Sequence, residues 1–96
     1  MNGSRPDDDI ADLTRSFLVR KRAEFEPFAD AQHLDLEGLA NAAHRLRGSG
    51  GAYGFDALSE VAERLEKAAA REQPAAARAA LEALMDLFDR LDAPAS

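Results

Sequence analysis

The chain has 96 residues, no cysteine and a formal net charge of −6. This length favours a single domain. The lack of cysteine excludes disulfides and cysteine-ligated zinc. The acidic charge disfavours nucleic acid as the main partner, because duplex binding needs clustered positive charge.

The composition also restricts the fold class and the cellular location. Hydrophobic residues make up 46% of the chain but aromatic residues only 6%, and many of the rest are alanine. This mixture favours closely packed helices over a sheet, whose strands prefer β-branched and aromatic residues. No apolar run approaches the ~20 residues of a membrane span, and no signal-peptide core is present. We therefore expect a cytoplasmic protein without membrane association.

A flexible leader is expected at 1–6, followed by one domain at 7–93 and a tail at 94–96. Asp7-Asp8-Asp9 predicts the start of the first helix, because carboxylates suit a helix N-terminus. The apolar stripe of this helix consists of Ile10, Leu13, Phe17, Phe25 and Phe28. Pro27 lacks a backbone donor and disfavours helix in the residue before it. The sequence therefore predicts a kink or a short extra helix near residues 24–32.

A second helix is expected from Leu36, with Asp35 as its N-cap. At about 100° per residue, one side of this helix is apolar. That side comprises Leu36, Leu39, Ala43, Leu46, Gly50 and Tyr53. His44 lies about 140° from the centre of the apolar side. We therefore expect its imidazole to be exposed.

Two further helices complete the pattern. The third has Asp56 as its predicted cap and a stripe formed by Leu58, Val61, Leu65 and Ala68. The fourth begins at Gln73-Pro74, where proline suits a first turn, and is ended by Pro94. Its stripe is Ala77, Leu81, Leu84, Phe88 and Leu91. Four amphipathic helices with short connections predict an all-α, antiparallel up-down four-helix bundle.

Residues 42–54 contain four glycines in a segment whose flanks read as helix. Each glycine costs about 1 kcal/mol of helix stability relative to alanine, so bare backbone needs a reason. Gly48 and Gly51 share the face of His44, which favours access for a partner. Gly50 lies on the apolar side, which favours close helix packing. Gly54 lies between the two faces and is expected to help end the helix.

The face of His44 also carries Glu37, Ala40, Asn41 and Arg47. Neutral imidazole is a competent nucleophile near pH 7. A guanidinium one turn away matches the oxygens of a phosphoryl group. Two plainer interpretations stay open: His44 as an ordinary exposed histidine, and Arg47 in a salt bridge to Glu37 or another carboxylate.

The segment resembles the histidine-containing phosphotransfer (HPt) domain of two-component phosphorelays. The family pattern is histidine, any residue, leucine, lysine or arginine, glycine, and a second glycine six residues on. It is met by His44, Leu46, Arg47, Gly48 and Gly54. A weaker resemblance extends over 8–92. The chain departs from the commonest form in having arginine rather than lysine at 47, a glycine-rich run after it, and Pro27.

This resemblance implies a four-helix bundle whose exposed histidine accepts a phosphoryl group and passes it to a response-regulator aspartate. By position, His44 would be the phospho-acceptor, Arg47 the basic group beside the phosphate, and Gly48 the residue that clears space. We add Gly51 to the partner-access surface. Candidate partner contacts are Arg45, Asn41 and Ala40.

The implied partners are response-regulator receiver domains and a histidine kinase or hybrid kinase. The domain would carry no cofactor or metal of its own, with Mg²⁺ on the partner receiver, and would show no turnover alone. An interaction module that binds such partners without transferring phosphate is the alternative. A helical adaptor would need a hydrophobic surface patch, and the apolar stripes look narrow enough to be used up inside one bundle. We therefore expect a monomer, and the chain's length and termini favour a stand-alone carrier.

Overall fold

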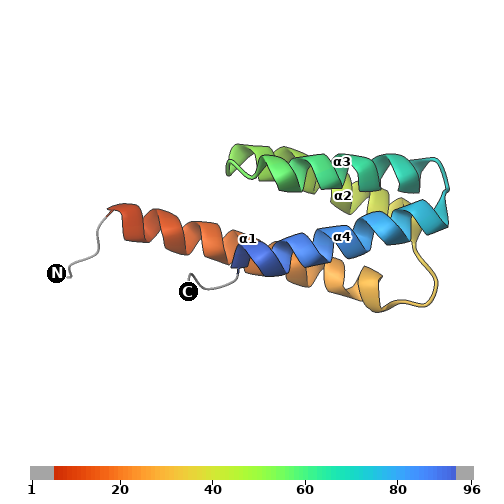
Figure 1. The fold of residues 1–96 in the computed structure, drawn as a ribbon, viewed down its shortest axis with the longest axis horizontal. Coiled ribbons are helices and arrows are strands. Elements are labelled where there is room, and N and C mark those ends of the chain that lie inside the picture. The colour runs from red at the N-terminus through yellow and green to blue at the C-terminus, as the bar shows by residue number, and fades with distance from the viewer. Residues whose placement is uncertain (1–5, 93–96) are drawn as a thin grey trace.

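The computed structural model describes residues 6–92, with side chains from Asp12 onward. This part of the chain forms four α-helices and no strand. They are α1 (Pro6–Asp30), α2 (Leu36–Ala52), α3 (Asp56–Ala70) and α4 (Pro74–Asp92). The helices alternate in direction, and α1 and α3 each pack against both α2 and α4 (Figure 1). The predicted all-α four-helix bundle is confirmed.

One apolar core fills the space between the helices, and no described polar or charged residue is buried. Its largest fully buried side chains are Phe17, Phe25, Phe88, Leu39, Leu46, Leu58, Leu65, Leu81 and Leu84. The stripe predicted for the third helix is buried throughout. Periodicity alone therefore located the interior face of α3 correctly.

Three predicted stripe residues are exposed, whereas Phe28 and Leu36 are half-buried and Ile10 lies outside the described side chains. Leu13 is 62% exposed, Tyr53 43% and Leu91 36%. Leu13 lies near the start of α1 and Leu91 in the last turn of α4, and the Arg15–Asp92 ion pair joins these parts of the two helices. Tyr53 follows the last residue of α2, and its ring stacks on Phe17 with 4.2 Å between centroids. The three predictions fail for the same reason. The apolar stripe of one helix does not show where the neighbouring helices end.

The short extra helix predicted as one possibility near residues 24–32 is absent, because α1 is a single helix through Pro27 to Asp30. The other possibility, a kink within the helix, stays a prediction. Phe25 is fully buried and packs against the ring of Phe88 at 6.2 Å. The guanidinium of Arg78 on α4 donates hydrogen bonds to the carbonyl oxygens of residues 29, 31 and 32. These contacts hold the end of α1 although proline removes one hydrogen bond of the helix.

Ion pairs also join α1 to α4. Arg22 Nε lies 2.7 Å from Asp89, and Arg15 Nε lies 3.4 Å from Asp92. Hydrogen bonds to Asp89 and then to Glu26 raise the pKa of Arg22 above its ordinary value. The guanidinium therefore stays charged wherever the bundle is folded.

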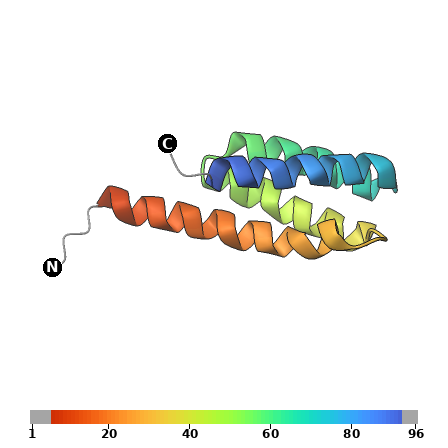
Figure 2. The same ribbon diagram turned by 60° about the horizontal axis from the view of Figure 1, so that its bottom comes forward.

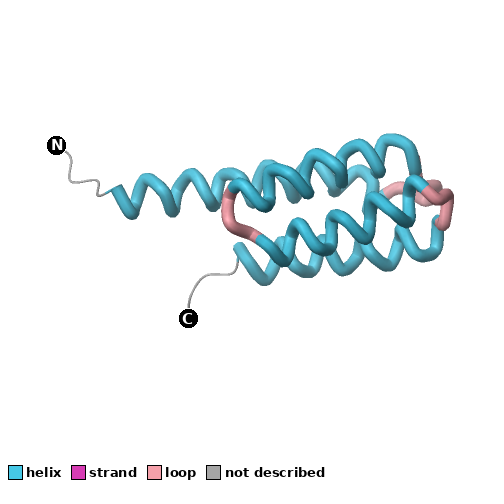
Figure 3. The backbone as a smooth tube through the Cα atoms, turned by 90° about the horizontal axis from the view of Figure 1, so that it is seen from above, coloured by secondary structure: helices cyan, strands magenta, loops and turns pink. Residues whose placement is uncertain are grey.

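The N-terminal turns of α1 extend past the end of the other three helices (Figures 2 and 3). Among the described side chains, the first buried one in α1 is that of Phe17. The molecule is accordingly elongated, with extents of 52 × 22 × 20 Å. One end of the bundle thus carries a helix segment with no neighbouring helix.

Helix ends follow the local sequence with one exception. The carboxylate of Asp35 accepts a hydrogen bond from the Gly38 amide at 3.0 Å, so it caps α2 as predicted. Asp56 is instead the first residue of α3, and Phe55 occupies the cap position without a side-chain hydrogen bond. α4 begins at Pro74 as predicted. Of the leader, only Pro6 is described, as the first residue of α1. The tail at 94–96 and Pro94 lie outside the described residues.

No helix within residues 6–92 is long and apolar enough to cross a membrane.

Candidate functional site

His44 lies midway along α2, and its side chain is 61% exposed, as the helical wheel predicted. The core side chains of α2 fix the rotation of the helix. Leu39, Ala43 and Leu46 are fully buried, so the face with His44 must point away from the interior. Exposure of the ring therefore follows from burial on the other side.

The imidazole is held by a carboxylate from the next helix. His44 Nδ1 lies 2.8 Å from Glu66 Oε2 on α3. An ionised carboxylate only accepts hydrogen bonds, so this contact requires a proton on Nδ1. In the neutral ring the lone pair is then on Nε2, which has no hydrogen-bond partner among the described residues. The exposed ring therefore carries its free lone pair on Nε2, where it could act as a nucleophile.

Arg47 shares the same carboxylate. Its Nη1 lies 3.1 Å from Glu66 Oε1, an ion-pair contact that does not have the geometry of a hydrogen bond, so this buried oxygen has no hydrogen-bond partner among the described residues. Arg47 Nη2 also lies 3.5 Å from His44 Nδ1. A guanidinium cannot donate to a nitrogen that already carries a proton, so the 2.8 Å contact to Glu66 determines the tautomer. The sequence left open a salt bridge from Arg47 to Glu37 or to another carboxylate. The partner is Glu66 and not Glu37.

A second contact between α2 and α3 supports this group. The hydroxyl of Ser59 on α3 donates to the backbone carbonyl of Arg47 at 2.6 Å. Gly50 is buried, and a Cβ added there would lie 3.4 Å from Leu58 Cβ. The two helices thus approach closely beside the site, which agrees with the packing role predicted for Gly50. This closeness brings Glu66 within reach of His44.

The two glycines assigned to partner access differ in their surroundings. Gly48 is exposed, and a Cβ added there would meet nothing within 4 Å. Neither packing nor backbone conformation requires glycine at this position. Gly51 is also exposed, but an added Cβ would lie 3.4 Å from the Ser59 hydroxyl. Gly51 therefore borders the α2–α3 contact, whereas Gly48 faces open space.

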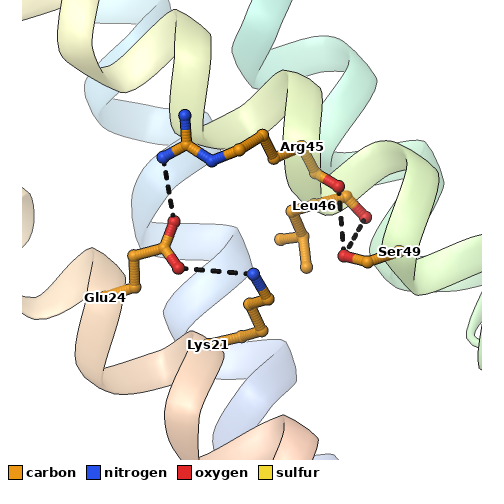
Figure 4. A network of polar contacts seen from close by, with 5 residues as sticks. All are labelled: Lys21, Glu24, Arg45, Leu46 and Ser49. Atoms are coloured by element: carbon orange, nitrogen blue, oxygen red, sulfur yellow. Dashed lines mark hydrogen bonds and ion pairs between the residues drawn. The ribbon is translucent and has the colours of Figure 1, made fainter.

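Arg45 points toward α1 rather than along the face of His44. Its Nη2 lies 3.2 Å from Glu24, which also pairs with Lys21 at 3.3 Å (Figure 4). The hydroxyl of Ser49 donates to the carbonyl oxygens of Arg45 and Leu46. This network links α1 to α2. The side chain of Arg45 nevertheless remains 60% exposed.

Asn41 and Ala40 line a groove of about 320 Å³ between α2 and α3, one turn before His44. Asn41 is exposed and Ala40 half-buried. The remaining lining residues are Leu36, Glu37, Ala69, Ala70 and Glu72. The candidate contact residues thus lie one turn before the histidine on the same helix. No cluster of three or more metal-ligating side chains occurs within the described part of the chain.

Glu66 is the residue of this candidate site that sequence reasoning missed. Nothing in the local spacing of the third helix distinguishes it from Glu60 or Glu63. The signal was available in the topology, because an antiparallel hairpin of α2 and α3 about the turn at 53–55 brings Glu66 level with His44. To use this signal, one must also know the rotation of α2 and α3 about their axes, which places Glu66 and His44 on the same side of the hairpin.

The family model for the Hpt domain matches residues 7–94. No curated protein and no solved structure matches the chain. The match spans all four helices, and the bundle with an exposed histidine on its second helix is the architecture that the family resemblance implied. This chain belongs to the Hpt domain family.

Proposed function

We propose that this protein is a phosphorelay carrier that accepts a phosphoryl group on Nε2 of His44. The donor is a phospho-aspartyl receiver domain or a kinase, and the final acceptor is a response-regulator aspartate. The observation that carries the proposal is the 2.8 Å contact between Glu66 and Nδ1, which leaves Nε2 free on an exposed ring.

The forward step is an in-line displacement. The Nε2 lone pair attacks phosphorus, and the bond from phosphorus to the donor's aspartyl oxygen breaks, which leaves the donor carboxylate. Because Nδ1 keeps its proton, the phosphorylated ring becomes positively charged. Glu66 lies beside that charge and stabilises it without any proton transfer. The reverse displacement, by an acceptor aspartate, returns Nε2 with its lone pair.

Arg47 contributes a cation at the rim of the site. Its side chain is 41% exposed and its guanidinium pairs with one carboxylate oxygen, so rotation toward the phosphoryl oxygens remains open. No cofactor of the protein's own enters this mechanism. Mg²⁺ on the receiver, together with the receiver's own residues, supplies the remaining charge stabilisation and explains why the domain alone has no turnover.

The proposal can be tested without knowing the partner. Phosphoramidate donates its phosphoryl group directly to imidazole nitrogen, so it can load the wild-type protein. We expect an acid-labile phosphate on His44, with NMR of ¹⁵N-labelled histidine assigning it to Nε2. A screen of receiver domains from the same genome should then find one that removes the label.

The second histidine of the chain supplies a matched control. His33 lies in the α1–α2 connection and is exposed, so His33→Ala should load and transfer like wild type. His44→Ala should carry no phosphate that a receiver domain removes, although the small donor can also label His33. Receiver-removable label that persists in His44→Ala would contradict the proposal. Receiver binding by wild type without any loading would instead favour the interaction module that transfers no phosphate.

A further inference from the structure

A second surface with a distinct character lies on the far side of α3 from the histidine. An open groove of about 420 Å³ runs between α3 and α4. Its floor and α4 wall are formed by Ala68, Ala76, Ala79, Ala80 and Ala83. Arg64, Lys67 and Arg71 form its cationic rim on α3. We call this surface the α3–α4 groove.

The α3–α4 groove is separate from the candidate phosphorylation site. Arg64 and Glu66 are two residues apart, and about 200° of helix rotation places them on opposite sides of α3. Lys67 pairs with Glu63 at 3.6 Å, whereas Arg64 and Arg71 have no ion-pair partner among the described residues. Two exposed, unpaired guanidinium groups thus border an apolar floor on a protein of net charge −6.

The start of α1 has the complementary character. The sequence from Pro6 to Leu13 contains four aspartates and no cation. Leu13 is 62% exposed, and this part of the helix extends past the bundle (Figure 2). The expectation of a monomer assumed that every apolar stripe is used inside one bundle. This segment contradicts that assumption, because its stripe leaves Leu13 without a covering helix.

The segment cannot reach the groove of its own chain. The α3–α4 connection lies at the end of the bundle where α1 finishes, whereas the start of α1 projects from the opposite end (Figure 1). α1 is a continuous helix of 25 residues, so it cannot fold back across the molecule. Only a second copy can bring the two surfaces together.

We propose that the acidic start of α1 from one copy docks in the α3–α4 groove of another copy. Leu13 contacts the alanine floor, where small side chains allow a helix to approach closely, and the aspartates face Arg64 and Arg71. The contact joins two different surfaces and is therefore heterologous. It is small and has charged edges, so the association is weak and is weakened further by salt.

Sedimentation velocity of the whole chain over a concentration series tests this proposal. At low ionic strength, the average mass should rise with concentration above the 10.4 kDa of one chain. At about 0.5 M salt, where the screening length is only a few ångströms, it should return toward that value. A single 10.4 kDa species at millimolar concentration and low salt would overturn the proposal.

Charge reversal in the groove gives the sharper test. Arg64→Glu/Arg71→Glu should weaken association at least about tenfold. The control Arg20→Glu/Arg90→Glu reverses two other exposed arginines and produces the same net charge. It should associate much as wild type does, and more strongly than the groove variant. Equal weakening by both variants would show a general charge effect and overturn the specific contact.

The complementary variants address the other surface. Asp8→Lys/Asp9→Lys/Asp12→Lys should also associate weakly by itself. Mixing it with Arg64→Glu/Arg71→Glu should restore association, because both contacts between the two variants pair opposite charges. Because lysine at a helix start can unwind the first turns, Leu13→Gln provides a variant that leaves the helix intact. It should weaken association with unchanged thermal unfolding. Unchanged association in Leu13→Gln would contradict the docking.

Discussion

One carboxylate fixes two different groups at the residue scale. Glu66 holds the imidazole of His44 through Oε2 and the guanidinium of Arg47 through Oε1. The first contact selects the tautomer, and the second keeps a cation beside the ring. In the proposed mechanism, His44 supplies the nucleophile and Glu66 acts through it as a positioning residue.

Glu66→Gln should separate positioning from mere packing. The amide can still accept from Nδ1, but it can also donate, so both ring tautomers become accessible and the charge that balances the phosphorylated ring is lost. We expect a mixture of tautomers by ¹⁵N NMR and a loss of about 10–100-fold in phosphorylation rate. Glu63→Gln, on the same helix and paired only with Lys67, is the control. An unchanged tautomer ratio in Glu66→Gln would remove its assigned role.

Gly48 offers a test of partner access. Gly48→Leu should raise the free energy of unfolding by about 1 kcal/mol, because the new side chain meets nothing and glycine disfavours helix. Loading by phosphoramidate should persist, since that donor is small. Transfer to a receiver should fall at least tenfold, because a steric cost of about 1.4 kcal/mol in the complex already corresponds to a factor of ten.

Gly50 provides the contrast to Gly48. Gly50→Leu should lower the free energy of unfolding by about 1–3 kcal/mol, because its side chain would push into Leu58 and the backbone of Ser59. Urea unfolding measures both stabilities. Receiver transfer at the wild-type rate in Gly48→Leu would show that the glycine does not serve access.

At the scale of elements, α2 and α3 end in the same way with different residues. In α2, the Gly54 and Phe55 amides donate to the carbonyls of Gly51 and Gly50, and Gly54 has a φ of +84°. In α3, the Glu72 and Gln73 amides donate in the same pattern, and Glu72 has a φ of +54°. Glycine adopts this left-handed conformation freely, whereas a side chain makes it costly.

Glu72→Gly should therefore stabilise the bundle by about 1 kcal/mol. Gly54→Ala should destabilise it by a similar amount, for the opposite reason. Chemical denaturation of the two variants beside wild type checks both signs. If both substitutions shifted the midpoint in the same direction, the end motifs would not be controlled by the left-handed residue.

The termination of α1 shows tertiary contacts overriding local preference. Pro27 predicted a break, yet the helix continues to Asp30. The last carbonyls of α1 and those of its connection accept hydrogen bonds from Arg78, which belongs to α4. A positive charge at a helix C-terminus also favours the helix dipole. No window of sequence around Pro27 contains this stabilising group.

At the scale of the whole molecule, a single core joins helices that are far apart in sequence. Phe88 of α4 is fully buried and packs 6.2 Å from the ring of Phe25 in α1. Because small domains have only about 5–15 kcal/mol of stability, one such contact is a large share of the total. The exposure of His44 depends on this core, since it sets the rotation of α2.

Phe88→Ala should lower the free energy of unfolding by about 3–5 kcal/mol and leave a bundle close to unfolding. Leu91→Ala removes a side chain of the same predicted stripe that is 36% exposed, and should cost less than about 1 kcal/mol. Thermal unfolding followed by circular dichroism compares them. Similar losses from the two variants would mean that the end of α4 is packed as tightly as its centre.

The sequence by itself determined the four helices, most of their buried faces and the exposure of His44. These features follow from side-chain periodicity, capping residues and proline positions, all of which act within one helix. The Asp35 cap, the start of α4 at Pro74 and the core position of Gly50 are examples.

Only the tertiary structure decided which groups from different helices meet. It placed Glu66 beside His44, gave Arg47 its carboxylate, carried α1 through Pro27 and left Leu13 exposed beyond the bundle. Each outcome depends on the rotation and relative height of two helices. Periodicity identifies the inner face of each helix but does not specify these quantities, because they are set by how the four faces pack together.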